Sequence, residues 1–169
     1  MSENIQINKN LDDEQIYDQL LPQLEALIDS DLPVISNMAN LAAGLFNAFD
    51  KISWCGFYIK SGDKLFLGPF CGNVACTIIN IGQGVCGTSA SQKETIIVPD
   101  VDKFPGHIAC DSGSRSEIVL PVYNGDTVFA VLDLDSYEYS SFNTTDKIYL
   151  EKLLNHFSDK LNLNKFQLL

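Results

Sequence analysis

A long connection between two segments of strand-like composition carries Cys110, and it restricts how this chain can fold more than any other feature. Residues 98–112 contain two prolines and a glycine, which interrupt regular structure. Long ordered loops in compact domains are usually functional, and loops on rigid scaffolds often carry reactive residues. Two further cysteines, Cys76 and Cys86, stand upstream in glycine-rich turns. This arrangement favours redox or nucleophilic thiol chemistry over a cysteine that fills a core.

Helical periodicity marks both ends of the chain. Apolar residues recur at helical spacing in residues 12–30, where Pro22 predicts either one kinked helix or two short ones. A second helix is expected over residues 33–49, and Asn143 or Thr144 caps a last one. The expected buried faces are Ile35, Met38, Ala42, Leu45 and Phe49 in the second helix and Ile148, Leu153, Leu154, Phe157 and Leu161 in the last.

The middle of the chain has the β-branched and aromatic composition of strands. Asn124-Gly125 predicts a type I′ hairpin turn between the last two strands, and a short helix is expected over residues 85–92. Helices from both chain ends packed on a mostly antiparallel central sheet make an α+β fold. We expect one domain over residues 1–169, with residues 1–11 as a poorly ordered tail. The expected strands are residues 52–60, 64–70, 77–81, 95–98, 117–122 and 127–135.

The charge and cysteine content limit the partners and the compartment of the protein. The 22 acidic and 11 basic residues give a net charge of −11, which disfavours nucleic acid and anionic membrane surfaces. The N-terminus has neither the basic start nor the apolar run of a secretory signal, and no stretch approaches the roughly 20 apolar residues of a membrane helix. Five cysteines without an export signal indicate a reduced, cytoplasmic setting, where a disulfide is transient and catalytic rather than structural.

Three acidic residues could form a second chemical element beside the cysteine. Glu117 begins one predicted strand, and Asp133 and Asp135 end its hairpin partner with the i, i+2 spacing that points two side chains to one face. If all three converge on Cys110, they cannot all ionise cheaply, so one keeps its proton near neutral pH. Such a group could donate to a leaving oxygen while the others hold an ammonium. The alternative is that these residues only solvate the strand ends.

The remaining thiols and the nearby histidine have simpler interpretations. Cys55 is most simply a small buried side chain, and Cys71 an incidental loop thiol. His107 would make a cysteine–histidine hydrolase only if the loop curled back, because it precedes Cys110 by three residues. The charge of Asp111 would raise the pKa of the Cys110 thiol, so activation must come from backbone N–H groups, a helix N-terminus or the substrate.

No zinc site is expected. The cysteines form no Cys-x-x-Cys pair, and His107 and His156 are the chain's two histidines, whereas a zinc site needs four organised ligands. Trp54 and Tyr58 lie four residues apart on one predicted strand and therefore on the same face. They are either core aromatics or the walls of an apolar pocket for a methyl or thioether group.

At this point the sequence resembles the free methionine-(R)-sulfoxide reductases, enzymes built on a GAF domain. The resemblance runs from residues 37–41 to residues 135–136, and it places the cysteines and the carboxylates in one pattern. An ordinary sensory GAF domain is not expected to carry both sets together. The motifs are Trp54-Cys55-Gly56-Phe57-Tyr58, Gly68-Pro69-Phe70, Ala75-Cys76-Thr77, Gly84-Val85-Cys86-Gly87-Thr88, the loop from Pro99 to Ser112, Ser116-Glu117-Ile118-Val119 and Leu132-Asp133-Leu134-Asp135-Ser136.

The resemblance implies a mechanism and a role for each cysteine. Cys110 would attack the sulfur of free methionine sulfoxide, release methionine and become a sulfenic acid. Cys76 matches the usual resolving cysteine, which gives a Cys76–Cys110 disulfide, and Cys86 is a secondary partner. A thioredoxin-type dithiol would then reduce the bridge, and the reaction would need neither a metal nor an organic cofactor.

The substrate-binding residues follow from the same resemblance. Glu117, Asp133 and Asp135 would bind the substrate and polarise the sulfoxide, and Trp54 and Tyr58 would enclose its methyl end. GAF domains also suggest a homodimer.

Two questions stay open at this stage. The family commonly has glutamine after Gly68-Pro69-Phe70, and this chain has Cys71, so a third thiol competes for the role of resolving cysteine. The alternative function is a GAF module that senses a small ligand without chemistry. That interpretation leaves the set of cysteines unexplained.

Overall fold

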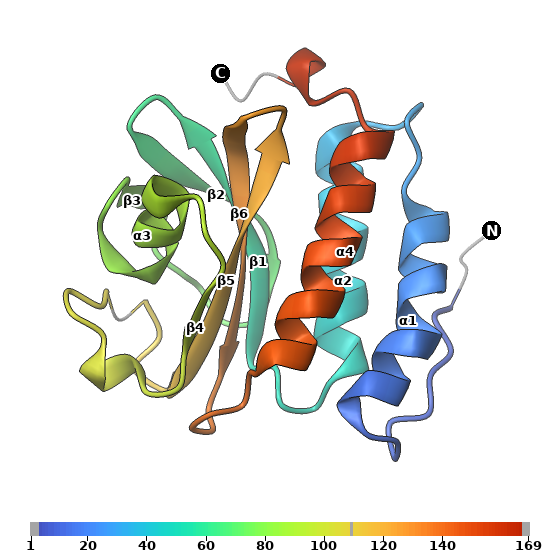
Figure 1. Ribbon diagram of the computed structural model, residues 1–169, viewed down its shortest axis with the longest axis horizontal. Coiled ribbons are helices and arrows are strands. Elements are labelled where there is room, and N and C mark those ends of the chain that lie inside the picture. The colour runs from blue at the N-terminus through green and yellow to red at the C-terminus, as the bar shows by residue number, and fades with distance from the viewer. Residues whose placement is uncertain (1–3, 109, 167–169) are drawn as a thin grey trace.

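The computed structural model describes residues 4–108 and 110–166 (Figure 1). Its α-helices are α1 (Asp13–Leu27), α2 (Val34–Ala48), α3 (Gly84–Gln92) and α4 (Thr144–Lys160). Short 3-10 helices lie at Val101–Lys103 and Leu163–Lys165. The strands are β1 (Trp54–Ser61), β2 (Lys64–Cys71), β3 (Ile78–Asn80), β4 (Ile96–Val98), β5 (Ser116–Asn124) and β6 (Thr127–Ser136).

The strands form one antiparallel sheet, and the helices divide between its two faces. The strand order is β3-β2-β1-β6-β5-β4. The helices from the chain ends, α1, α2 and α4, cover one face, whereas α3 and the connection after β4 lie on the other (Figure 1). The predicted α+β fold, with helices from both ends on an antiparallel sheet, is confirmed. No helix in the described part of the chain is both long and apolar enough to cross a bilayer.

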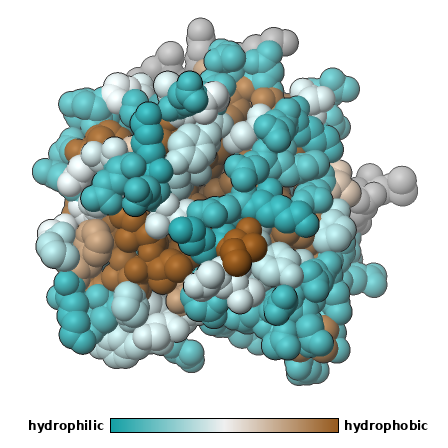
Figure 2. Space-filling model, in the orientation of Figure 1, coloured by the Kyte–Doolittle hydropathy of each residue, from teal (hydrophilic) through white to brown (hydrophobic). Residues whose placement is uncertain are grey.

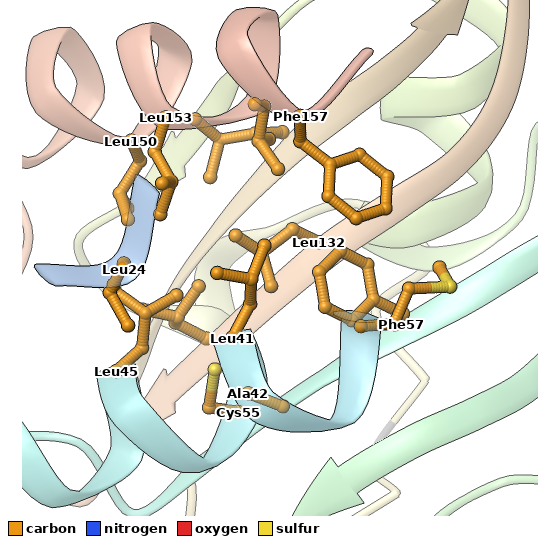
Figure 3. Close-up of a cluster of buried hydrophobic side chains, with 14 of the residues drawn as sticks. Leu24, Leu41, Ala42, Leu45, Cys55, Phe57, Leu132, Leu150, Leu153 and Phe157 are labelled. Atoms are coloured by element: carbon orange, nitrogen blue, oxygen red, sulfur yellow. The ribbon is translucent and has the colours of Figure 1, made fainter. Parts of the chain in front are cut away.

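The main core lies between the sheet and the three helices. Figure 3 shows Leu41 of α2, Leu132 of β6 and Phe157 of α4 meeting in this layer, and all three are almost completely buried. Burial of one such side chain contributes about 1.5–3 kcal/mol. Outside this layer, the surface seen in Figure 2 is mostly hydrophilic, with its largest hydrophobic area at the lower left.

Alternation along β1 decides which side chains enter this core and which remain for the other face. Cys55 and Phe57 point toward the helices, whereas Trp54 and Tyr58 belong to the smaller apolar cluster on the opposite face. Helix α3 covers that second cluster with Val85 and its neighbours. The second face therefore carries the residues singled out in the sequence.

Helix α1 runs without a break through Pro22, so the first predicted segment is a single helix. Asp12 caps it by accepting a hydrogen bond from the backbone N–H of Gln15 at 2.9 Å. Residues 4–11 belong to the segment for which the sequence predicts a poorly ordered tail. In the structure they lie along α1, where the side chain of Gln23 bonds the backbone of Gln6.

Several local expectations are wrong in instructive ways. Ile148 is 59% exposed, because the buried side of α4 includes Asp146 and Leu150 instead. Ile35 is 39% exposed, since the buried side of α2 begins at Asn37 and Met38. Strands β5 and β6 meet across Gly125 and Asp126, and the positive φ there belongs to Gly125. A type I′ turn requires positive φ at both central residues, so the predicted turn type is not formed.

A buried carboxylate joins both chain ends to the start of the sheet. Asp146 is fully buried in the first turn of α4, where it accepts from Lys51 Nζ at 2.7 Å and from the Tyr17 hydroxyl at 3.0 Å. Its other oxygen accepts from the backbone N–H of Asn143 at 2.8 Å, which completes a capping box. The side chain of Asn143, one of the two predicted caps, accepts from Thr145 N–H.

Replacement of Asp146 by alanine should therefore lower the free energy of unfolding by about 3–5 kcal/mol, because Lys51 would be left buried with fewer partners. Urea denaturation of the purified variant measures this loss. The matched control is Lys147→Ala in the next position, whose exposed pair with Glu151 spans 3.9 Å and should contribute less than about 0.5 kcal/mol. Similar losses in both variants would contradict the structural role of Asp146.

Candidate active site

Strand register gathers the predicted acidic residues on the face opposite the helix layer. Asp135 of β6 pairs with Trp54 of β1 on one side and with Glu117 of β5 on the other. Asp133 points to the same face as Asp135 because side chains alternate along a strand. The acidic residues do not simply solvate strand ends: Glu117 and Asp133 are each only 6% exposed.

A small cavity lies over these carboxylates. Its volume is about 30 Å³, far below the roughly 300 Å³ of a pocket that encloses a small-molecule ligand. Cys110 lines it together with Glu117, Asp133 and Asp135, so the structure brings the predicted cysteine and carboxylates to one place.

Burial of the carboxyl groups raises their pKa values. Desolvation raises the pKa of Glu117, and the negative charges of Asp133 and Asp135 raise it further. Desolvation also raises the pKa of Asp133 to about 7, against the opposing effect of hydrogen bonds from Cys86 and Glu117. The pKa of Asp135 is raised by desolvation and then by the charge of Asp133. The cluster therefore retains at least one proton near neutral pH.

Cys86 is a hydrogen-bond donor inside this cluster. Its Sγ lies 3.2 Å from Asp133 Oδ2, and the side chain is buried. Desolvation, followed by the charges of Asp133 and Glu117, raises the pKa of the thiol, so Cys86 is neutral. The other oxygen, Asp133 Oδ1, is buried and has no hydrogen-bond partner among the described residues. An orphaned buried oxygen that lines a cavity is available to a ligand.

Cys86, Glu117 and Asp133 are also close enough to hold a metal ion. One ligand atom from each lies within 4.8 Å of the others. Metal binding would require the thiolate of Cys86, which its surroundings disfavour. The donor set thus fits a proton-sharing cluster better than a zinc centre.

The long connection is tied to the rest of the pocket by a disulfide between Cys76 and Cys110. Their Cα atoms are 5.3 Å apart. The backbone oxygen of Cys76 accepts from the Tyr58 hydroxyl at 3.0 Å, so the bridge rests on the aromatic residues of β1. This is the pairing that the family resemblance implies.

Aromatic rings form the other wall of the site. The Trp54 ring stacks on Phe70 and on Tyr58, with centroids 5.4 Å and 6.0 Å apart. Its indole N–H donates to the backbone oxygen of Asn73 at 3.0 Å. Gly56 leaves room for this ring, since a Cβ there would lie 2.5 Å from Trp54. Trp54 and Tyr58 therefore line a hollow that also includes Cys110, as a pocket wall would.

Asp111 lies at the edge of the cavity and holds the loop in place through hydrogen bonds. It accepts from the Tyr137 hydroxyl at 2.9 Å, from Gly113 N–H at 2.9 Å and from the Asn73 amide at 3.2 Å. These hydrogen bonds lower the pKa of Asp111, which remains charged beside Cys110. Sequence reasoning missed Asn73 and Tyr137, because no motif links residues that meet only through folding.

Cys71 and Cys55 lie on the wrong face to reach the disulfide. They are cross-strand partners at the ends of β2 and β1, and Cys55 packs into the helix-side core. The neighbouring Phe70 instead stacks on Trp54, on the pocket side. Cys71 ends a strand rather than lying in a loop, and its alternation with Phe70 turns it away from Cys110.

His107 forms part of the cavity wall. Its Nε2 lies 3.8 Å from Glu117 Oε2, and its side chain is mostly buried. Desolvation lowers the pKa of the imidazole. The structure therefore pairs His107 with a carboxylate of the site.

Comparison with known proteins agrees with this arrangement. A family model described as GAF domain matches residues 28–162. GAF domain-containing protein A of Dictyostelium discoideum is 48% identical over 91% of this chain and 97% of its own length. The free methionine-R-sulfoxide reductase of Saccharomyces cerevisiae is 43% identical over 90% of this chain and 89% of its own.

A solved structure is similar over a comparable length. Free methionine-R-sulfoxide reductase from Neisseria meningitidis, determined in complex with its substrate, superposes with a TM-score of 0.85 at 40% identity, covering 89% of this chain and 90% of that one. Sequence and structural similarity therefore extend over nearly the whole length of both chains. The chain belongs to the GAF-domain family, and within that family to the group of the free methionine-R-sulfoxide reductases.

Proposed function

We propose that the protein reduces free L-methionine-(R)-sulfoxide to L-methionine with its own thiols. The observation that carries this proposal is the Cys76–Cys110 bridge beside the enclosed carboxylates, in a chain of the reductase group. The sulfur chemistry and the proton source needed for sulfoxide reduction lie together in this site. Neither element has an evident use in a module that only binds a ligand.

The proposed reaction has two steps in the protein. The thiolate of Cys110 attacks the sulfoxide sulfur, and the oxygen passes to Cys110 Sγ, so that the substrate S–O bond breaks as the Cys110 S–O bond forms. With one added proton, the products are methionine and a sulfenic acid on Cys110. The thiol of Cys76 then attacks that sulfenic acid and releases water, which leaves the disulfide. In sum, one sulfoxide and two thiols give one methionine, one disulfide and one water.

The carboxyl cluster supplies the proton for the first step. A protonated carboxyl in an enclosed site donates to the sulfoxide oxygen as negative charge develops on it. The pKa of Asp133, raised to about 7 by burial, is suited to this task near neutral pH. A member of the cluster that is ionised attracts the substrate ammonium, and Glu117 and Asp135 line the same cavity as Asp133.

The hydrogen bond from Cys86 to Asp133 supports a secondary role for that cysteine. A neutral thiol is a poor nucleophile, and the pKa of Cys86 is raised by burial. Cys76 resolves the sulfenic acid in the intact protein, and Cys86 serves only when Cys76 is missing. Cys71 takes no part in the proposed reaction, because its side chain lies on the opposite face of the sheet from Cys110.

The two aromatic residues, Trp54 and Tyr58, set the orientation of the substrate in the site. Trp54 and Tyr58 enclose the methyl end, and the amino-acid end points toward Glu117. Because the cavity of the disulfide form is so small, the loop that carries Cys110 moves outward when the bridge is reduced and so admits the substrate.

A thioredoxin-type dithiol returns the bridge to two thiols by exchange. Cys76 and Cys110 are only partly buried, which supports access by such a reductant. A reducing cytoplasm would provide this dithiol. A homodimer stays a prediction.

The direct test is a single turnover of pre-reduced protein with free L-methionine-(R)-sulfoxide, followed by mass spectrometry of the cysteines. We expect about one methionine per chain and a new Cys76–Cys110 bridge. Cys110→Ser should form no methionine, because it lacks the attacking sulfur. Cys76→Ser should still form it once but slow repeated turnover by roughly tenfold or more.

Cys71→Ser is the matched control, since it removes a thiol on the opposite face and should recycle like the wild type. If the wild type forms no methionine and keeps its thiols, the chain is a ligand-binding GAF module. Normal recycling by Cys76→Ser would instead show that another thiol resolves the sulfenic acid.

Asp133→Asn should stabilise the disulfide form at high pH. A buried acid whose folded pKa is about 7 favours folding below its unfolded pKa near 4, and this stability is lost as the pH rises toward 7. The variant avoids the loss, so its advantage in unfolding free energy should grow by roughly 2–4 kcal/mol between pH 4 and pH 8.

Urea denaturation across that pH range measures the difference. Asp126→Asn, in the exposed turn between β5 and β6, provides the control and should show no such trend. An Asp133→Asn effect that is independent of pH would show that the carboxyl is ionised without penalty in the folded protein.

A further inference from the structure

The proposed substrate poses a charge problem for this site. A free amino acid carries a carboxylate as well as an ammonium, and the cavity is lined by Glu117, Asp133, Asp135 and Asp111. Four acidic side chains attract the ammonium but repel the carboxylate. A site that accepts the whole molecule therefore needs a group that favours negative charge.

The cavity has two distinct ends. Asp133, Asp135 and Cys110 line both the cavity and the aromatic hollow, so they lie in the middle. Trp54 lines only the hollow, whereas His107 and Glu117 line only the cavity. With the methyl group at Trp54, the amino-acid end falls at His107 and Glu117.

His107 is the one basic side chain among the described residues that line the cavity. Its Nε2 lies 3.8 Å from Glu117 Oε2, a donor beside an acceptor. The ammonium and carboxylate of an amino acid are joined through a single carbon. The two substrate groups therefore present a donor and an acceptor at a similar separation. The ammonium can face the acceptor Glu117, and the carboxylate can face the donor His107. A neutral imidazole still offers one N–H to a carboxylate.

The start of α3 strengthens this end of the cavity. Gly84, Val85 and Cys86 line it, and Gln83 makes no side-chain capping hydrogen bond at the helix N-terminus. The first N–H groups of a helix have no partner inside the helix and favour negative charge. Independently, the buried and unpartnered Asp133 Oδ1 in the same cavity indicates that this space is built for a ligand.

We propose that His107, with the N-terminus of α3, binds the α-carboxylate of the substrate, while Glu117 binds the ammonium. This inference rests on the proposed function and explains its preference for the free amino acid. A methionine sulfoxide within a peptide has neither charged group, so it leaves the N–H of His107 and the carboxyl group of Glu117 without their substrate partners. His107 is thus a specificity-determining residue and not the base of a hydrolase.

The test compares two substrates that differ only at the carboxylate: methionine sulfoxide and its carboxamide, which keeps the ammonium. The wild type should have a kcat/KM at least about tenfold higher for the acid. His107→Ala should lower kcat/KM for the acid by about tenfold, mainly through KM, and for the amide by less than about twofold. His107→Gln, which keeps an N–H donor, should recover part of the loss.

Lys103→Ala is the matched control, because it removes an exposed cation from the same connection. It should behave like the wild type on both substrates. Equal losses of activity on acid and amide in His107→Ala would mean that His107 only supports the loop, and would overturn the inference. Equal wild-type activity on the two substrates would overturn it without any variant. A wild type that reduces neither substrate would instead overturn the proposed function.

Discussion

The pairing of β6 with β1 and β5 is the constraint on which the rest of the structure depends. It sets Trp54, Asp135 and Glu117 in one row across three strands, and it places Asp133 one pleat further along the same face. A slip of β6 by one residue would turn Asp133 and Asp135 into the helix-side core, where a carboxylate would have no partner. The large apolar layer shown in Figure 3 opposes such a slip, because it requires Phe57 and Leu132 on the other face.

The buried carboxyl groups cost the folded protein stability, and their raised pKa values keep a proton in the site. Three carboxyl groups enclosed together keep at least one proton near neutral pH, and the neutral Cys86 thiol donates into the same cluster. This proton is what a sulfoxide oxygen needs as its bond to sulfur breaks. The Cys76–Cys110 bridge lies at the cavity over the cluster, and in the proposed mechanism the oxidised protein admits substrate only after a dithiol has reduced it. Charge, burial and redox state therefore act on the same few residues.

Much of the fold and part of the site could be predicted from local sequence. Periodicity predicted the helices and strands closely, and the i, i+2 spacing of Asp133 and Asp135 correctly predicted a shared face. The face of Cys71 could not be predicted, because it depends on where β2 ends. Tyr137, Asn73 and Asp146 were missed because their contacts span long stretches of sequence. Ile148 was misplaced because a buried aspartate occupies the inward position of the first turn of α4.

The central claim is that the enclosed carboxyl cluster holds a proton at neutral pH. Titration of the side-chain carboxyl carbons by ¹³C NMR, in the wild type and in Asp133→Asn, tests it most directly. The account predicts at least one carboxyl that titrates near pH 7 or above in the wild type, and a changed titration of its neighbours when Asp133 is replaced. If every aspartate and glutamate titrates near its ordinary value of about 4, the cluster is fully ionised and the proposed proton donor does not exist.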